Sequence, residues 1–186
     1  MPKTRPAKRQ DTVREPHDAT PEFPVVGIGA SAGGLEALKE LFQTVPAESG
    51  MAFIVVQHLD PTRKGMLVEL LQHASRLPVV AATHDVRVER GHVYVIPPNK
   101  DLAVAGGRLL LSAPAEPRGL RLPVDFLFRS LAEAFGERSL GVVLSGMGSD
   151  GTAGLRAIRE HGGATFAQSV ESAKFDGMPR SAIDAG

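Results

Sequence analysis

Three segments of this chain place a serine, a histidine and an aspartate where a catalytic site can form. Ser31 follows an apolar run that ends in glycines, His58 follows a second apolar run, and Asp150 comes shortly after a third. A serine hydroxyl is a weak nucleophile until a base takes its proton, and a third group must hold that base in the right tautomer. The three segments therefore supply the side chains that nucleophilic acyl transfer needs.

The apolar runs before these residues are typical of buried strands in a parallel sheet. Residues 24–29, 51–57 and 140–144 are short and nearly continuous in apolar or glycine residues, as in sheets that are covered on both faces. The carboxyl ends of parallel strands share one edge, and open α/β sheets bind their ligands there. We therefore expect the serine, the histidine and the aspartate to lie together at that edge.

Helical and strand patterns alternate along the rest of the chain. Helices are expected after Ser31, where Leu35, Leu38, Leu41 and Phe42 recur at helical spacing, and at residues 66–73, 124–135 and 151–161. Further strands are expected at residues 79–82, 92–96 and 164–167, with a hairpin of residues 101–105 and 108–111 around Gly106 and Gly107, and a loop at 112–123. The candidate core residues of the 124–135 helix are Phe126, Leu127, Leu131 and Phe135. The alternation predicts one domain of α/β class: a doubly wound, mainly parallel sheet with helices on both faces, a three-layer αβα fold.

The neighbours of Ser31 favour a reactive serine but also allow simpler roles. Glycines on both sides permit a tight turn and a close approach of substrate to the backbone. A helix that begins near Ala32 or Gly33 would present free N–H groups and its positive dipole end to a developing oxyanion. Ser31 could equally be the N-cap of that helix.

Two sequence patterns around Ser31 point to other classes of protein. GIGASA at residues 27–32 fits the dinucleotide fingerprint, but the second strand ends in Gln57 and His58 rather than in the acidic residue that would hold a ribose. GASAG at residues 29–33 fits the elbow pattern G-x-S-x-G, although the chain order Ser, His, Asp differs from the α/β-hydrolase order. Neither pattern alone assigns a fold.

His58 and Asp150 also have structural alternatives. A histidine at a strand end is often only a hydrogen-bonded structural residue, and Asp150 could cap the helix that follows it. His84, Asp85 and His92 do not have a recognised metal-ligand spacing, so no metal site is expected.

Composition predicts a soluble cytoplasmic protein. The chain has 186 residues, a formal net charge of zero and no cysteine, so nothing draws it to nucleic acid and no disulfide can form. No apolar run approaches the roughly 20 residues that span a bilayer, and no apolar core of a signal peptide follows the basic N-terminal residues. Residues 1–22 mix charges without apolar periodicity, which predicts a disordered tail or docking arm before a domain at residues 23–186.

At the three strand ends the chain resembles the catalytic domain of the chemotaxis protein-glutamate methylesterases, the CheB type. The matching pieces are VGIGAS at residues 26–31, QH at 57–58, LSGMGSDG at 144–151 and DGMPRSA at 176–182. They occur in the right order and spacing, and the resemblance covers about residues 23–186. YVIPPNK at residues 94–100 and GLRLPVD at 119–125 are most similar to the forms fused to a receptor methyltransferase.

The resemblance implies hydrolysis of glutamate γ-methyl esters on the cytoplasmic helices of methyl-accepting chemoreceptors, with release of methanol. Many members also deamidate specific receptor glutamines. By position, Ser31 corresponds to the nucleophile, His58 to the general base and Asp150 to the residue that orients His58. The backbone N–H of Met147 corresponds to an oxyanion donor, beside those at the helix start. No cofactor, metal, nucleic acid or direct membrane insertion is implied, and a fused or associated methyltransferase domain is an expected partner.

Three departures from the family pattern are visible. Stand-alone members carry a regulatory receiver domain where this sequence has the short tail. Ala32 stands where many members have threonine, so a hydrogen bond from that hydroxyl is lost. Members continue through another strand and helix after the position of Gly186, which predicts that the domain here lacks its C-terminal end. These departures leave a non-catalytic signalling module of the same fold as the alternative to an enzyme.

Overall fold

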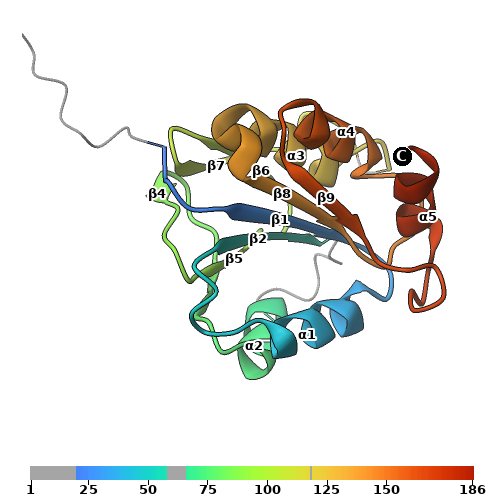
Figure 1. Cartoon of the computed structure of the whole chain (residues 1–186), viewed down its shortest axis with the longest axis horizontal. Coiled ribbons are helices and arrows are strands. Elements are labelled where there is room, and N and C mark those ends of the chain that lie inside the picture. The colour runs from blue at the N-terminus through green and yellow to red at the C-terminus, as the bar shows by residue number, and fades with distance from the viewer. Residues whose placement is uncertain (1–19, 58–65, 118) are drawn as a thin grey trace, which may run out of the picture.

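A six-stranded parallel sheet lies at the centre of the computed structural model (Figure 1), which describes residues 20–57, 66–117 and 119–186. Its strands are β1 Val25–Ala30, β2 Ala52–Gln57, β3 Val79–Ala81, β5 Val93–Val95, β8 Ser139–Val143 and β9 Ala164–Ala167. They follow the order β3-β5-β2-β1-β8-β9, and all neighbouring pairs are parallel. Because β2 and β8 lie on opposite sides of β1, the topological switch point is beside β1.

Helices cover both faces of this sheet, as Figure 1 shows. They are α1 Gly34–Thr44, α2 Met66–Ala74, α3 Pro123–Phe135, α4 Thr152–Glu160 and α5 Gly177–Asp184. Helices α1 and α2 pack on one face, and α3 and α4 pack on the other, where α5 adds Met178 and Ala182 to the core. A small antiparallel sheet of β4 Val86–Arg87, β6 Asp101–Ala105 and β7 Arg108–Ser112 joins the core on the α3 side. The expected three-layer α/β architecture is confirmed.

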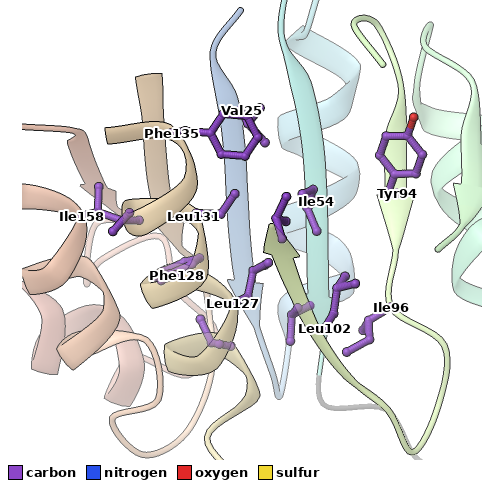
Figure 2. Close-up of a cluster of buried hydrophobic side chains, with 14 of the residues drawn as sticks. Val25, Ile54, Tyr94, Ile96, Leu102, Leu127, Phe128, Leu131, Phe135 and Ile158 are labelled. Carbon is purple, nitrogen blue, oxygen red and sulfur yellow. The ribbon is translucent and has the colours of Figure 1, made fainter. Parts of the chain in front are cut away.

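Side chains along the central strands alternate between two cores. Val25 of β1 and Ile54 of β2 point to the α3 face, where Phe128 and Leu131 meet them (Figure 2). The residues that alternate with these along the same strands, such as Ile28, belong to the core under α1 and α2. Each central strand supplies side chains to both cores, because neighbouring residues of a strand point to opposite faces. This explains why these strands look continuously apolar in the sequence.

Glycines on β1 and β8 let the helices of the α3 face approach the sheet closely. A Cβ at Gly27 would lie 2.5 Å from the Leu131 side chain, and a Cβ at Gly29 would overlap the side chain of Val124. Gly141 of β8 has the same role beneath α4. These positions have no side chain because helix side chains occupy the space that a Cβ would need.

Most elements form close to the bounds expected from the sequence, including the hairpin of β6 and β7. The expectation that Phe126 is a core residue is wrong: it is 45% exposed, because the buried stripe of α3 runs through its neighbours on the other side of the helix. Three short elements were not expected, namely β4, α5 and a 3₁₀ turn at Gly136–Arg138. Each is too short for its apolar spacing to distinguish helix from strand.

The N-terminal segment expected to be a tail lies almost entirely outside the described residues, which begin at Thr20. From Phe23 onward the chain contacts the core, and the guanidinium of Arg90 lies 5.3 Å from the centre of the Phe23 ring. Within the described ranges, no helix has the length and apolar character needed to cross a membrane.

Replacing Gly29 by alanine tests the close approach of α3 to β1. The new Cβ would overlap Val124, so we expect Gly29→Ala to lower the free energy of unfolding by about 1–3 kcal/mol in urea denaturation. Val124→Ala removes the overlapping methyl groups, so the double variant should be more stable than the sum of the two single losses predicts. Strict additivity would contradict the proposed contact.

Candidate active site

Ser31 lies in the turn between β1 and α1. Helix α1 begins at Gly34, and its N-cap is Gly33, which has a φ of 70° and gives no side-chain capping bond. The N–H of Gly34 donates to the carbonyl of Ser31 at 3.0 Å, which closes the turn. The alternative that Ser31 is the N-cap is therefore wrong. Its side chain is half-buried beside the start of α1, as a nucleophile near free helix N–H groups would be.

The turn at Ser31 is bound directly to the loop that follows β8. The N–H of Ser31 donates to the carbonyl of Ser145 at 3.0 Å, and the N–H of Leu144 donates to the carbonyl of Gly29 at 2.9 Å. Gly146 lies so near that a Cβ on it would be 3.0 Å from the Ser31 Cβ. The two strand ends thus meet at the switch point through backbone contacts, as the sequence predicts.

Ser145 holds three segments together from a fully buried position. Its hydroxyl donates to the carbonyl of Ala32 at 2.9 Å and accepts the N–H of Phe175 at 3.0 Å. Its own N–H donates to Oε1 of Gln168 at 2.8 Å. A buried hydroxyl with these partners fixes the backbone after the nucleophile, because breaking any of these hydrogen bonds would leave a polar group without a partner at a cost in free energy.

The end of β2 approaches Ser31 from the other side. Nε2 of Gln57 donates to the carbonyl of Ser31 at 3.4 Å. His58 follows directly, but residues 58–65 lie outside the described part of the chain. The contact expected between Ser31 and His58 therefore stays a prediction, supported by the position of Gln57.

Asp150 is 5% exposed and caps a helix, but not the one that follows it. Its Oδ2 accepts the N–H of Val124 at 3.1 Å, and its Oδ1 accepts the N–H of Asp125 at 2.9 Å, both in the first turn of α3. Helix α4, which follows Asp150, has Gly151 at its N-cap without a side-chain bond. The alternative that Asp150 caps its own helix is wrong, and the carboxylate is held at the positive end of α3 instead.

A cavity of about 580 Å³ opens at this edge of the sheet. Its lining includes three predicted site residues, Ser31, Met147 and Asp150, whereas Ala32 and Gly33 are not part of it. Met147 is 65% exposed at the mouth of the cavity. The cavity is large enough for an extended side chain such as an esterified glutamate.

The remaining walls come from residues that the sequence motifs alone do not assign to the site. They are Val56, Gln57, Ile96, Pro97, Pro98, Asn99, Lys100, Asp101, Gly119, Arg121, Leu122, Pro123, Gly148 and Ser149. Most of these belong to the segments at 94–100 and 119–125 that carry the family resemblance. Lys100 and Arg121 bring positive charge to the cavity, and Asp101 and Asp150 bring negative charge.

One further carboxylate, Asp125, lies behind Asp150. Burial raises the pKa of Asp125, and the nearby charge of Asp150 acts in the same direction, while the N–H of Gly154 opposes the shift by donating to Oδ1. In the sequence, Asp125 is visible only as part of a matching motif, and no local pattern pairs it with Asp150. Among the described residues, no cluster of three or more His, Cys, Asp or Glu side chains could hold a metal ion.

The fold and the site define an α/β protein of the doubly wound class with a candidate nucleophilic serine at its topological switch point. A family model described as "CheB methylesterase" matches residues 26–186. The chain belongs to this family, as its strand-end motifs predict.

Curated relatives and a solved structure agree with this membership. The protein-glutamate methylesterase FrzG of Myxococcus xanthus is 39% identical over 184 residues, which cover 95% of this chain and 55% of the relative. A protein-glutamate methylesterase/protein-glutamine glutaminase of Photorhabdus laumondii is 38% identical over 87% of this chain and 47% of its own length. The chain thus spans about half the length of these curated relatives.

One similar solved structure is the catalytic domain of the CheB methylesterase of Thermotoga maritima. It superposes with a TM-score of 0.81 at 31% sequence identity, and the match covers 87% of this chain and 88% of that one. The two chains therefore share the α/β fold over most of their length.

Removing the hydroxyl of Ser145 tests whether it supports the serine turn. Ser145→Ala removes a fully buried hydroxyl and leaves the N–H of Phe175 and the carbonyl of Ala32 without this partner, so we expect a loss of about 1–3 kcal/mol in the free energy of unfolding. Ser31 should also react more slowly with a fluorophosphonate probe. Ser169→Ala is the matched control, because that hydroxyl is exposed and bonds only within its own turn. Equal effects of the two substitutions would contradict the role of Ser145.

Proposed function

We propose that this chain hydrolyses glutamate γ-methyl esters on chemoreceptors, with Ser31 as nucleophile, His58 as general base and Asp150 as the residue that orients His58. The observation that carries the proposal is that Ser31 and a buried, backbone-held Asp150 line one cavity at the switch point. The segment that contains His58 begins at Gln57, whose amide already contacts Ser31. The family supplies the ester class.

The proposed reaction is a two-step acyl transfer. His58 takes the proton of Ser31 while the oxygen of that serine attacks the ester carbonyl. The N–H groups of Met147 and of the α1 start at Ala32 and Gly33 stabilise the oxyanion. The C–O bond to the methoxy group breaks, and His58 returns the proton so that methanol leaves. Water, deprotonated by His58, then attacks the acyl-enzyme and frees the glutamate carboxylate and Ser31.

The proposed substrate is a cytoplasmic receptor helix, and the protein would act in the cytoplasm. Lys100 and Arg121 at the cavity suit a helix rich in glutamate, because positive groups attract the carboxylates beside the ester.

A glutamine side chain would react by the same steps and release ammonia, so deamidation belongs to the proposal. A fused or associated receptor methyltransferase is the proposed partner, and residues 23–186 are the proposed catalytic domain after a tail at 1–22.

Methanol release from a methylated receptor fragment tests the assignment. Ser31→Ala removes the nucleophile, so we expect the rate to fall at least about 1,000-fold while the melting temperature stays close to that of the wild type. Ser112→Ala, an exposed serine at the end of β7, is the control and should retain the wild-type rate.

Labelling by a fluorophosphonate probe separates this proposal from a non-catalytic module. The wild-type protein should label and Ser31→Ala should not. A folded wild-type protein that neither labels nor releases methanol would favour the module that binds receptors without turnover.

A further inference from the structure

Helices α3 and α4 cap each other through two buried carboxylates. Asp150, just before α4, accepts the N–H groups of Val124 and Asp125 at the start of α3. Asp125, in the first turn of α3, accepts the N–H of Gly154 in the first turn of α4 at 2.6 Å. Neither helix has a side-chain cap from its own N-cap residue. The first turn of each helix is therefore capped by an aspartate that lies at the start of the other helix.

The packing leaves no other place for these carboxylates. Both aspartates are 5% exposed. A Cβ at Gly154 would lie 2.5 Å from the Cβ of Phe128 and 3.1 Å from the Cα of Asp125, so the two helices touch backbone to backbone at this point. Neither carboxylate can move far without separating α3 from α4.

The electrostatics show that this arrangement is costly by itself. Burial and the facing carboxylate of Asp150 raise the pKa of Asp125, and Arg129, one turn along α3, is the positive side chain that opposes them. Two like charges buried close together destabilise a fold unless hydrogen bonds offset them. The backbone N–H groups of Val124, Asp125 and Gly154 supply these bonds, so the pair is offset only while both helix starts stay in place.

We propose that Asp125 is a positioning residue for the esterase reaction, which locks Asp150 and the 147–151 backbone through the crossed caps. The inference rests on the proposed function. Asp150 reaches the cavity from the same short loop that carries the N–H of Met147. The bond from Gly154 to Asp125 ties the first turn of α4, which directly follows this loop, to α3, and the bonds to Asp150 tie the end of the loop itself. Asp125 thus fixes the orienting carboxylate and the oxyanion donor together, without touching the substrate.

The test compares Asp125→Ala with Asp125→Asn in the full chain. Alanine removes the acceptor for the Gly154 N–H, and we expect kcat for methanol release to fall about tenfold with KM within about twofold. Asparagine keeps an oxygen in the same place, so kcat should return to within about threefold of the wild type. Glu133→Ala, which removes an exposed carboxylate from the same helix, is the matched control.

The pH profile distinguishes positioning from a loss of packing. In the proposed mechanism the charge of Asp150 favours the protonated form of His58, and a displaced Asp150 would favour it less. If Asp150 shifts in Asp125→Ala, the acidic limb of kcat/KM should move to lower pH, by about half a unit or more. A variant that is only less stable would keep the wild-type limb at temperatures well below its melting point.

Several results would overturn the inference. One is a wild-type kcat and pH limb in folded Asp125→Ala, and another is an equal loss in Asp125→Asn, which would show that charge rather than the acceptor matters. If circular dichroism shows Asp125→Ala to be unfolded, Asp125→Ser replaces it and should still lower kcat at least threefold with the same direction of pH shift. A wild-type protein without esterase activity would instead overturn the proposed function, and the two failures are therefore distinguishable.

Discussion

The close approach of α3 to β1 is the constraint on which the rest of the site depends. It exists because Gly27 and Gly29 offer no side chains toward the helix, so that Val124 and Leu131 pack against the strand backbone. Only at this depth can the first N–H groups of α3 reach the carboxylate of Asp150. Two glycines that appear in the sequence as part of a nucleotide-like fingerprint thus serve a helix rather than a ligand. A substitution that adds a side chain at Gly29 would push against Val124, and it would therefore also displace the Asp150 carboxylate at the cavity.

The site is assembled mainly by backbone groups. Ser31 is placed by the carbonyl of Ser145 and by its own bond to the N–H of Gly34, and Asp150 is placed by two N–H groups of α3. Backbone partners do not depend on side-chain rotamers, so the candidate nucleophile and its distant carboxylate are fixed as firmly as the strands that carry them. Other walls of the cavity come from residues 97–101 and 119–122, which take no part in the backbone bonds that place Ser31 and Asp150.

The sequence predicted the sheet, its main helices and the meeting of Ser31 with the Asp150 loop, because these follow from apolar periodicity and from the common edge of parallel strands. It placed Phe126 in the core wrongly, since one apolar residue at the border of a helical stripe can fall on either side of it. It could not show which helix Asp150 caps, nor that Asp125 returns the bond. Both are contacts between residues about 25 positions apart or more, which only the tertiary packing decides. The role of His58 remains a prediction.

The crossed caps also bear on how the chain folds. The residues that complete α3 and α4 are separated in the sequence by most of α3 and by β8, so neither helix start gains its partner until the two helices pack together. Ordering of the 147–151 loop is thereby coupled to packing of the hydrophobic core rather than to local helix formation. A partly folded intermediate with α3 or α4 alone would leave the Asp150 carboxylate without its partners in α3. The cavity at the switch point therefore takes its shape only when both helices are in place.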